Sequence, residues 1–126
     1  MNERHFLALA GGVGGGKFAQ GLAQILKPTE LTVVVNTADD FEHWGLQICP
    51  DIDSVLYAMS GQNDTQRGWG LGGETWNVMD RMRVLGGETW FQLGDRDLVT
   101  HLLRSRGLGQ GKSLSVACAF VRHALS

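Results

Sequence analysis

The sequence predicts an α/β fold in which helices flank a parallel sheet. A short apolar run at residues 5–10 ends abruptly at glycine, and a second apolar run, rich in β-branched residues, covers residues 31–36. Between them, apolar residues recur at helical spacing over residues 17–26. Two buried strands joined by a glycine loop and a helix form a βαβ unit, which is expected to cross right-handed in a parallel sheet.

The rest of the chain is predicted to continue as helices and loops with one more strand. Residues 37–45 are polar and acidic and predict a loop, and residues 61–73 predict a glycine-rich loop. Pro50 is favoured at a first helical position, and Ser113 can cap a helix. The predicted helices cover residues 48–60, 75–84, 97–106 and 113–125, and the third strand covers residues 90–93.

The predicted sheet is incomplete at the C-terminal end of the chain. Three strands are fewer than the roughly five or six of a usual open α/β sheet. The elements still alternate where the sequence stops. We therefore interpret residues 1–126 as the N-terminal part of a single Rossmann-like domain, either a fragment or a truncated chain.

Composition and charge exclude several classes of protein. The chain has 126 residues, of which 43% are hydrophobic and 19% charged, and this is ordinary for a soluble domain. A net charge of −2 without a basic stripe argues against nucleic acid as the main ligand. The two cysteines form no CxxC pair, and the N-terminal apolar run is too short for a signal peptide or a membrane span. We expect a cytoplasmic protein without membrane attachment.

The glycine-rich segment at residues 11–16 predicts a phosphate-binding loop. It follows a strand and opens a helix, where backbone N–H groups point at an anion. The P-loop of a nucleoside triphosphatase would need Ser or Thr at the position of Phe18. A dinucleotide site would need an acidic residue at the position of Asn36. The segment therefore predicts a phosphate-bearing ligand bound by neither standard pattern; a tight turn without a ligand is the alternative.

Acidic residues cluster after the second strand and at the start of the next helix. Asp39 and Asp40 lie in the loop, and Asp51 and Asp53 lie in the first helical turn. Ligands of open α/β sheets bind beyond the carboxyl ends of the strands, so these carboxylates are expected to face the glycine loop. Their hard oxygens suit Mg²⁺ beside a phosphate group. The alternative is a solvated loop followed by carboxylates that only stabilise the helix dipole.

Two further places carry weaker signals. Arg96 offers a planar fork for a phosphate or carboxylate, and Asp97 and His101 stand four residues apart on one helix face. An ordinary helix cap with a surface pair explains this pattern equally well. Trp69 lies in a glycine-rich loop, and it is the tryptophan that we expect to stack on a ligand.

Four motifs occur in one order along the chain: GGVGGGK, VVNTADDFEHWGLQICPDIDSVLY, RGWG followed by ETWN, and WFQLGDRDLVTHLLR. Together they resemble the 2-phospho-L-lactate transferase family (the CofD and FbiA type) over residues 7–125. The resemblance implies a Rossmann-like core. It also implies transfer of a phospholactyl or phosphoenolpyruvyl group from a guanosine diphosphate-activated donor to the deazaflavin Fo. GMP leaves, Mg²⁺ is required, and the product belongs to coenzyme F-420 biosynthesis.

The resemblance also implies roles for individual residues. Asp39 and Asp51 match the metal-coordinating carboxylates and are the expected catalytic residues. The residues expected to bind substrate are Gly12, Gly14, Gly15, Asn36, Asp40, Asp53, Trp69 and Arg96. Neither Asp40 nor Asp53 can be preferred as the general base. Complete family members are well over twice as long, and their C-terminal part contributes to the site and to a possible homodimer.

Two alternatives stay open. One is a non-catalytic regulator of the same superfamily that binds a nucleotide-sugar (the gluconeogenesis-factor type), which would not bind Fo. The other is a dinucleotide-binding module of an oxidoreductase, against which Asn36 argues.

Overall fold

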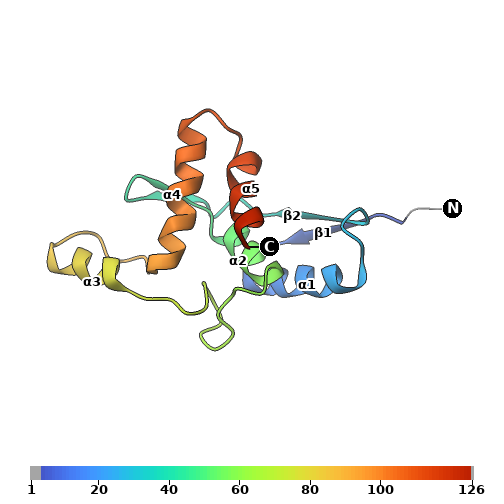
Figure 1. Ribbon diagram of the computed structural model, residues 1–126, viewed down its shortest axis with the longest axis horizontal. Helices are drawn as coiled ribbons and strands as arrows, with labels where there is room; N and C mark the ends of the chain where they lie inside the picture. The colour runs from blue at the N-terminus through green and yellow to red at the C-terminus, as the bar shows by residue number, and fades with distance from the viewer. Residues whose placement is uncertain (1–3, 126) are drawn as a thin grey trace.

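The computed structural model describes the backbone of residues 4–125 and the side chains of residues 4–119. Strand β1 (Phe6–Ala10), helix α1 (Gly12–Ile25) and strand β2 (Leu31–Val35) form the predicted βαβ unit (Figure 1). The two strands pair in parallel, with Phe6 opposite Leu31 and Ala10 opposite Val35. This arrangement confirms the α/β fold with a parallel sheet and flanking helices.

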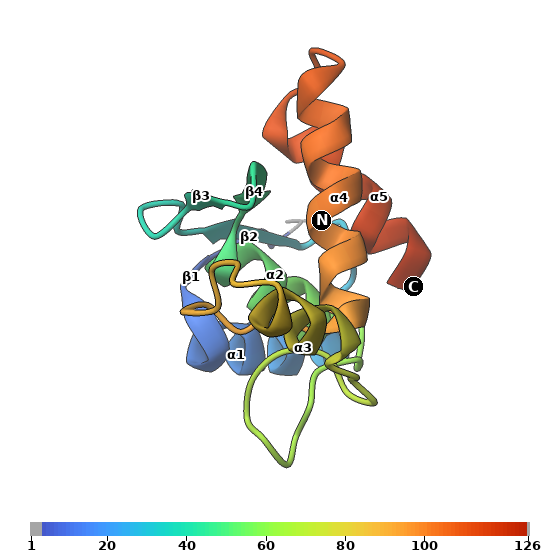
Figure 2. The same cartoon turned by 90° about the vertical axis from the view of Figure 1, so that its left-hand side faces the viewer.

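The sheet is covered on one face by α1 and α2 (Pro50–Met59), as Figures 1 and 2 show. Ala8 and Ala10 point to this face and are buried, so small side chains let the helices approach the sheet. Leu7 and Leu9 point the other way and are 65% and 77% exposed. A parallel sheet is normally covered on both faces, and within the described residues this sheet is covered on one.

The segment that follows β2 contains a hairpin that the sequence analysis did not predict. Strands β3 (Phe41–His43) and β4 (Leu46–Ile48) pair antiparallel within the expected loop and just after it. Their two-residue turn has positive φ at both Trp44 (53°) and Gly45 (72°), as a type I′ turn requires. Tryptophan rarely adopts a positive φ, so Trp-Gly is a weak sequence signal for this turn.

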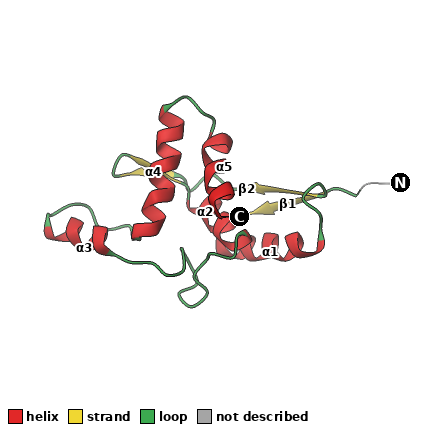
Figure 3. Ribbon diagram, in the orientation of Figure 1, coloured by secondary structure: helices red, strands yellow, loops and turns green. Residues whose placement is uncertain are grey.

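Four helices follow the hairpin, at the places where the sequence predicts them (Figure 3). Besides α2 they are α3 (Asn77–Val84), α4 (Asp95–Gly109) and α5 (Leu114–Leu125). The Ser113 hydroxyl accepts a hydrogen bond from the Val116 N–H at 3.3 Å, which confirms the predicted cap. Figure 2 shows α4 and α5 side by side, rising away from the sheet. Within residues 4–125, no helix has the length and apolar character needed to cross a membrane.

The predicted strand at residues 90–93 is wrong, because these residues adopt no strand. Trp90 and Phe91 pack instead against the β3–β4 hairpin, with ring centroids 5.5 and 5.0 Å from that of Phe41. The aromatic and apolar content that predicted a strand therefore serves side-chain packing.

The predicted glycine loop is also wrong in its extent, because α1 begins at Gly12 and includes the remaining glycines. A Cβ at Gly15 would lie 2.9 Å from the Ala10 Cα, and a Cβ at Gly16 would lie 3.0 Å from the Ser54 carbonyl oxygen. Both positions need glycine because β1 and α2 approach α1 closely. Helix packing thus accounts for part of the glycine cluster that the sequence analysis assigned to ligand binding.

This packing gives a matched pair of variants within α1. Gly15→Ala should lower the free energy of unfolding by about 1–3 kcal/mol, because the new methyl group meets the β1 backbone. Gly14→Ala should raise it by about 0.5–1 kcal/mol, since no atom lies within 4 Å of the added Cβ and alanine favours the helix. Urea unfolding followed by circular dichroism measures both. Equal effects of the two substitutions would contradict the close contact at Gly15.

Candidate functional site

A polar site lies where β1 and β2 end. The Asn36 N–H donates to the Ala10 carbonyl at 3.0 Å, which extends the strand pairing by one residue. The Asn36 side-chain amide donates to an Asp51 carboxylate oxygen at 2.9 Å. Positions for a Cβ at Gly11 and Gly12 lie 3.5 and 3.8 Å from the same carboxylate. The first turn of α2 therefore brings Asp51 to the start of α1, at the sheet edge where ligands of this architecture bind.

Asn36 is held in one orientation by its own loop. Its side-chain oxygen accepts the Ala38 N–H at 3.1 Å, which leaves the amide nitrogen to donate to Asp51. This is an Asx-type turn, in which a side chain replaces a backbone hydrogen bond. The residue that disfavours a dinucleotide site in the sequence thus orients the Asp51 carboxylate.

The two loop carboxylates differ in environment. Asp39 is exposed, whereas Asp40 is half-buried and hydrogen-bonds the Cys49 thiol at the entrance to α2. Burial raises the pKa of Cys49 to about 12, so the thiol stays protonated and donates. One oxygen of Asp40 is buried and has no hydrogen-bond partner among the described residues. An unpaired buried carboxylate oxygen fits a divalent cation, whose preferred ligands are hard oxygens.

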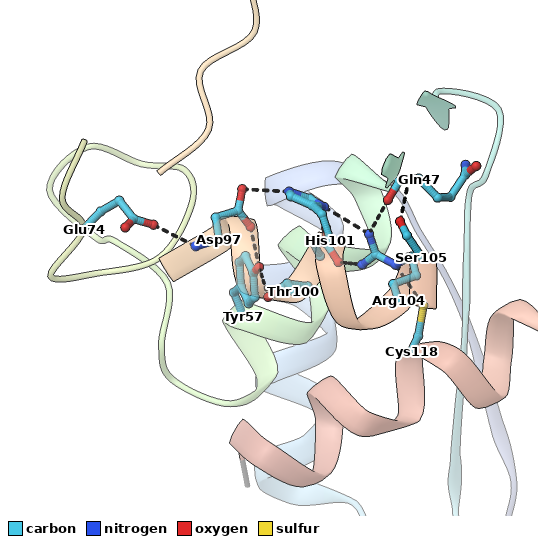
Figure 4. Close-up of polar contacts among 10 residues, drawn as sticks. Gln47, Tyr57, Glu74, Asp97, Thr100, His101, Arg104, Ser105 and Cys118 are labelled. Atoms are coloured by element: carbon cyan, nitrogen blue, oxygen red, sulfur yellow. Dashed lines mark hydrogen bonds and ion pairs between the residues drawn. The ribbon is translucent and has the colours of Figure 1, made fainter. Parts of the chain in front are cut away.

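Asp53 lies on the other side of α2, in a buried polar cluster with α4. It is 5% exposed and pairs with Arg104, whose side chain is completely buried. Arg104 also donates to the Gln47 carbonyl oxygen at 3.2 Å and to the Cys118 sulfur at 3.3 Å. Figure 4 shows how these contacts join α4 to the hairpin and to α5. Burial raises the pKa of Asp53 to about 6, against the influence of Arg104.

His101 and Asp97 continue the cluster along α4 (Figure 4). His101 Nε2 lies 3.1 Å from an Asp97 oxygen, and Arg104 Nη1 lies 3.2 Å from His101 Nδ1. Because the guanidinium can only donate, His101 Nδ1 accepts and Nε2 carries the proton that it donates to Asp97. The Tyr57 hydroxyl donates to Asp97 at 2.5 Å. Burial would raise the pKa of Asp97, but the contacts with His101 and Tyr57 outweigh it and lower the pKa.

Asp53, Asp97 and His101 each offer one ligand atom, and these atoms lie within 4.8 Å of one another. This donor set is compatible with a divalent metal ion. Both nitrogens of His101 are already hydrogen-bonded, however, and the Arg104 charge lies beside Asp53. Among the described residues, no cationic side chain contacts the carboxylates at the sheet edge, so none would compete there with a metal ion.

Trp69 and Arg96 lie on the glycine-rich loop and at the start of α4. Trp69 is 41% exposed, and the Arg67 guanidinium lies 4.3 Å from its ring centroid. The Arg96 side chain is exposed and its guanidinium donates to the Gly72 carbonyl, while the Arg96 backbone N–H donates to a Glu74 carboxylate oxygen at 2.7 Å. The structure therefore does not bring either residue into contact with Asp51.

A cavity of about 370 Å³ lies between α2, α4 and the Trp69–Gly70 turn. Its polar wall comes from Asp53, Asp97 and His101. A groove of about 410 Å³ runs between α1, β2 and α2, but it is lined almost entirely by apolar side chains, with Lys27 as its charged residue. We regard the smaller cavity as the candidate small-molecule site, because it combines apolar walls with a few convergent polar groups.

Arg104 and Tyr57 are the functional-site residues that the sequence analysis missed. Arg104 follows Asp97 and His101 at helical spacing, so the three polar side chains share one face of α4. That stripe is a usable signal for a buried polar network. Tyr57 stands one turn after Asp53 on α2 and gives no comparable signal.

An aromatic cluster surrounds His43 on the hairpin. His43 is 2% exposed, its ring stacks on Trp44 at a centroid distance of 4.9 Å, and Trp90 meets it edge-on at 5.0 Å. Neither ring nitrogen has a hydrogen-bond partner among the described residues; the exposed Glu88 carboxylate lies 3.7 Å away. Burial lowers the pKa of His43 below its ordinary value of 6.5, although Glu88 opposes the shift.

This lowered pKa predicts a pH dependence of stability. Because folded His43 binds a proton less readily than unfolded His43, its contribution to stability is present above pH 6.5 and is lost as the pH falls. The raised pKa of Asp53 acts in the opposite direction over the same range but is common to both proteins, so the urea midpoint of the unmodified chain should fall, relative to that of His43→Phe, which keeps an aromatic ring, between pH 7.5 and pH 5.5. Identical pH dependences for the two proteins would show that His43 does not stay neutral in the folded state.

Comparisons with known proteins point to one family of enzymes. The model of the family described as 2-phospho-L-lactate transferase CofD matches residues 6–126. A phosphoenolpyruvate transferase of Kitasatospora aureofaciens is 48% identical over 111 residues, which cover 86% of this chain and 35% of that protein. Proteins of the same name from Nocardia farcinica and Mycolicibacterium smegmatis are 46% and 44% identical, and the alignments cover 86% and 85% of this chain and 33% and 36% of those proteins. The chain thus spans about a third of the length of these relatives.

Proposed function

Since the chain belongs to the 2-phospho-L-lactate transferase CofD family, we propose that it forms the N-terminal part of a single Rossmann-like transferase domain acting in coenzyme F-420 biosynthesis. The observation that carries this proposal is the placement of Asp51, which Asn36 holds against the glycine-rich start of α1 at the carboxyl ends of β1 and β2. The reaction is transfer of a phospho-acid group from a guanosine diphosphate-linked donor to the deazaflavin Fo, with release of GMP.

Charge neutralisation is what this reaction needs most, because a diphosphate anhydride is broken. Asp39 and Asp51 would hold Mg²⁺, and Asp40 would contribute its unpaired oxygen. When bound, Mg²⁺ supplies electrostatic stabilisation of the phosphate oxygens. The chain's own part is positional: the Asn36 amide fixes the Asp51 carboxylate, and the Cys49 thiol fixes Asp40.

The remaining residues are assigned to the substrates. The start of α1 would receive the diphosphate on its backbone N–H groups, at Gly12, Gly14 and Gly15, since a helix N-terminus favours anions. Trp69 would stack on a planar ring, and Arg96 would contact a phosphate or carboxylate. Asn36 and Asp40 would line the substrate side of the metal, and Asp53 would contact substrate from the cavity between α2 and α4. The helix start at Gly12 beside Asp51 supports this arrangement.

The transferred acid is inferred from the names of the relatives, and the cellular location is inferred from the cysteines. The similar proteins are named phosphoenolpyruvate transferases, so we propose phosphoenolpyruvate rather than phospholactate as the transferred acid. Cys49 and Cys118 are free and buried, which supports a reducing, cytoplasmic location. A homodimer is proposed for the complete enzyme.

The test is group transfer measured directly. The chain is assayed alone and as a chimera in which it replaces the matching third of the Kitasatospora aureofaciens relative, with Fo, Mg²⁺ and the guanosine diphosphate-linked phosphoenolpyruvate donor. We expect the chimera to release GMP and to form the Fo adduct, both detected by liquid chromatography. A folded chimera that binds guanosine diphosphate but neither binds nor modifies Fo would overturn the transferase and favour a nucleotide-sugar-binding regulator.

A further inference from the structure

The N-terminus of helix α4 is capped by a side chain from another segment. Its own N-cap residue is Gly94, which has no side chain to accept a hydrogen bond. The Glu74 carboxylate accepts there instead, from the Arg96 N–H at 2.7 Å and from the Asp97 N–H at 3.1 Å (Figure 4). A Cβ at residue 94 would collide with the Glu74 carboxyl group, so this cap requires glycine. Glu74 therefore replaces the side chain that an N-cap residue normally supplies.

Helix α3 is capped in the reverse direction, from the first turn of α4. Its N-cap residue, Trp76, makes no side-chain cap bond. The Asp95 carboxylate accepts hydrogen bonds around the start of α3, from the Thr75 hydroxyl at 2.6 Å, the Val78 N–H at 2.9 Å and the Asn77 N–H at 3.0 Å. These bonds, that of Thr75 first, lower the pKa of Asp95 to about 2, so the carboxylate stays charged near neutral pH. The starts of α3 and α4 thus hold each other in place.

The segment that caps α4 also holds the side chain of Arg96. The Arg96 guanidinium donates to the Gly72 carbonyl, and the Arg96 backbone N–H donates to Glu74. Gly73 lies between these two acceptors with a φ of 66°, which favours glycine, and a Cβ there would lie 3.2 Å from Arg96 Nη1. Residues 72–74 therefore fix both the backbone and the side chain of Arg96. A guanidinium has five N–H donors, so the bond to one carbonyl leaves others for an oxyanion.

We propose that Glu74 is the positioning residue of Arg96 and that it sets the affinity for the substrate that Arg96 contacts. The inference rests on the proposed function, which gives Arg96 that contact, and it adds a residue that does not touch substrate. Without the Glu74 bonds the first turn of α4 frays, and the guanidinium loses the fixed place from which its planar fork binds. Asp97 keeps its contacts with Tyr57 and His101, so the change stays within that turn.

A repeat in the sequence supplies an internal control for this assignment. The hexapeptide LGGETW occurs at residues 71–76 and again at residues 85–90. The glutamate of the second copy, Glu88, has a side chain that is 71% exposed and lies 3.7 Å from His43. Among the described contacts, Glu88 caps neither α3 nor α4. Two glutamates with the same sequence neighbours therefore differ in whether they hold the start of α4.

The test is a double-mutant cycle on the chimera, in which isothermal titration calorimetry measures the dissociation constants of the guanosine diphosphate-linked donor and of Fo. Arg96→Met should weaken the binding of one substrate by on the order of tenfold to a hundredfold, because bonds to a charged group are lost. Glu74→Met should weaken the binding of the same substrate by about three- to tenfold, because Arg96 is present but no longer held. The double variant should bind it no more weakly than Arg96→Met alone, since Glu74 acts only through Arg96.

Two controls separate positioning from a general loss of stability. Glu88→Met makes the same change in the second hexapeptide and should leave both dissociation constants unchanged. Ser113→Ala removes the cap of α5, so it should lower the urea midpoint about as much as Glu74→Met does while both dissociation constants stay the same. Glu74→Gln keeps one acceptor oxygen and should lie between the unmodified chimera and Glu74→Met. It takes the place of Glu74→Met in the cycle if that variant fails to fold.

Additive effects of Glu74→Met and Arg96→Met would overturn the proposal, because Glu74 would then act by another route. Equal effects of Glu74→Met and Ser113→Ala on the dissociation constants would overturn it as well, as would normal affinity for both substrates in Arg96→Met.

The two proposals fail in distinguishable ways. If the cycle shows the coupling but the chimera releases no GMP, Glu74 positions Arg96 and the transfer reaction fails. If the chimera releases GMP but folded Glu74→Met binds both substrates normally, the transferase stands and this inference is wrong. If the folded chimera binds neither substrate, both proposals are wrong.

Discussion

Replacing Asp51 with asparagine should lower the rate of group transfer by about two to three orders of magnitude, the loss typical when one preorganised electrostatic group is removed. Asparagine keeps the shape of the side chain but removes the charge that faces the start of α1. The change should also raise the Mg²⁺ concentration needed for half-maximal rate. Initial rates of GMP release by the chimera, measured over a range of Mg²⁺ concentrations, give both quantities.

The control for Asp51→Asn is Asp80→Asn, which removes a carboxylate from the surface of α3, where it pairs with Arg83 at 3.2 Å. That variant should retain nearly the full rate. Asn36→Ala is informative as well, because it frees the Asp51 carboxylate without removing its charge. It should lower the rate less than Asp51→Asn does. A normal rate in folded Asp51→Asn would remove the central residue of the proposed site.

Arg104→Met should have the largest effect on stability, lowering the free energy of unfolding by about 3–5 kcal/mol. The substitution keeps most of the length of the side chain but leaves Asp53 buried without its cationic partner. It also removes the hydrogen bonds to the Gln47 carbonyl and the Cys118 sulfur. Urea unfolding at pH 7.5, followed by circular dichroism, measures the loss.

The matched control is Arg83→Met, which breaks an exposed pair on α3 and should cost less than about 1 kcal/mol. A second comparison removes both buried charges. The double substitution of Asp53→Leu with Arg104→Met should be less destabilising than the sum of its parts, because neither charge is then left unpaired. Additive effects would show that the two side chains do not act as a pair.

The fold was readable from sequence where one local pattern determined each element. The β-branched run of β2 and the helical spacing of α1 predicted the βαβ unit, and Pro50 located the start of α2. The misplaced elements depended on tertiary context. The Trp44 turn needs a backbone conformation that tryptophan rarely adopts, and Trp90 has its place in an aromatic cluster rather than in a sheet.

The candidate site was readable in part for the same reason. Once a helix is predicted from Pro50, Asp51 and Asp53 must be separated by roughly 200° around the helix axis. The two carboxylates of this motif therefore lie on nearly opposite faces of the helix, in different environments. The sequence analysis grouped these carboxylates at one edge, whereas the structure separates them. The partner of Asp53 is Arg104, 51 residues along the chain, and no local pattern encodes a pairing at that distance.

The stacking of Trp44 on His43 gives the chain an optical signal of its own. A protonated imidazole in contact with an indole ring quenches the fluorescence of that ring, so the fluorescence of Trp44 depends on the charge of His43. Acidification that protonates His43 should therefore lower the intensity of tryptophan fluorescence while the helices are still folded. Tryptophan fluorescence would then measure proton uptake by the β3–β4 hairpin without an added dye. In His43→Phe this loss of fluorescence on acidification should disappear.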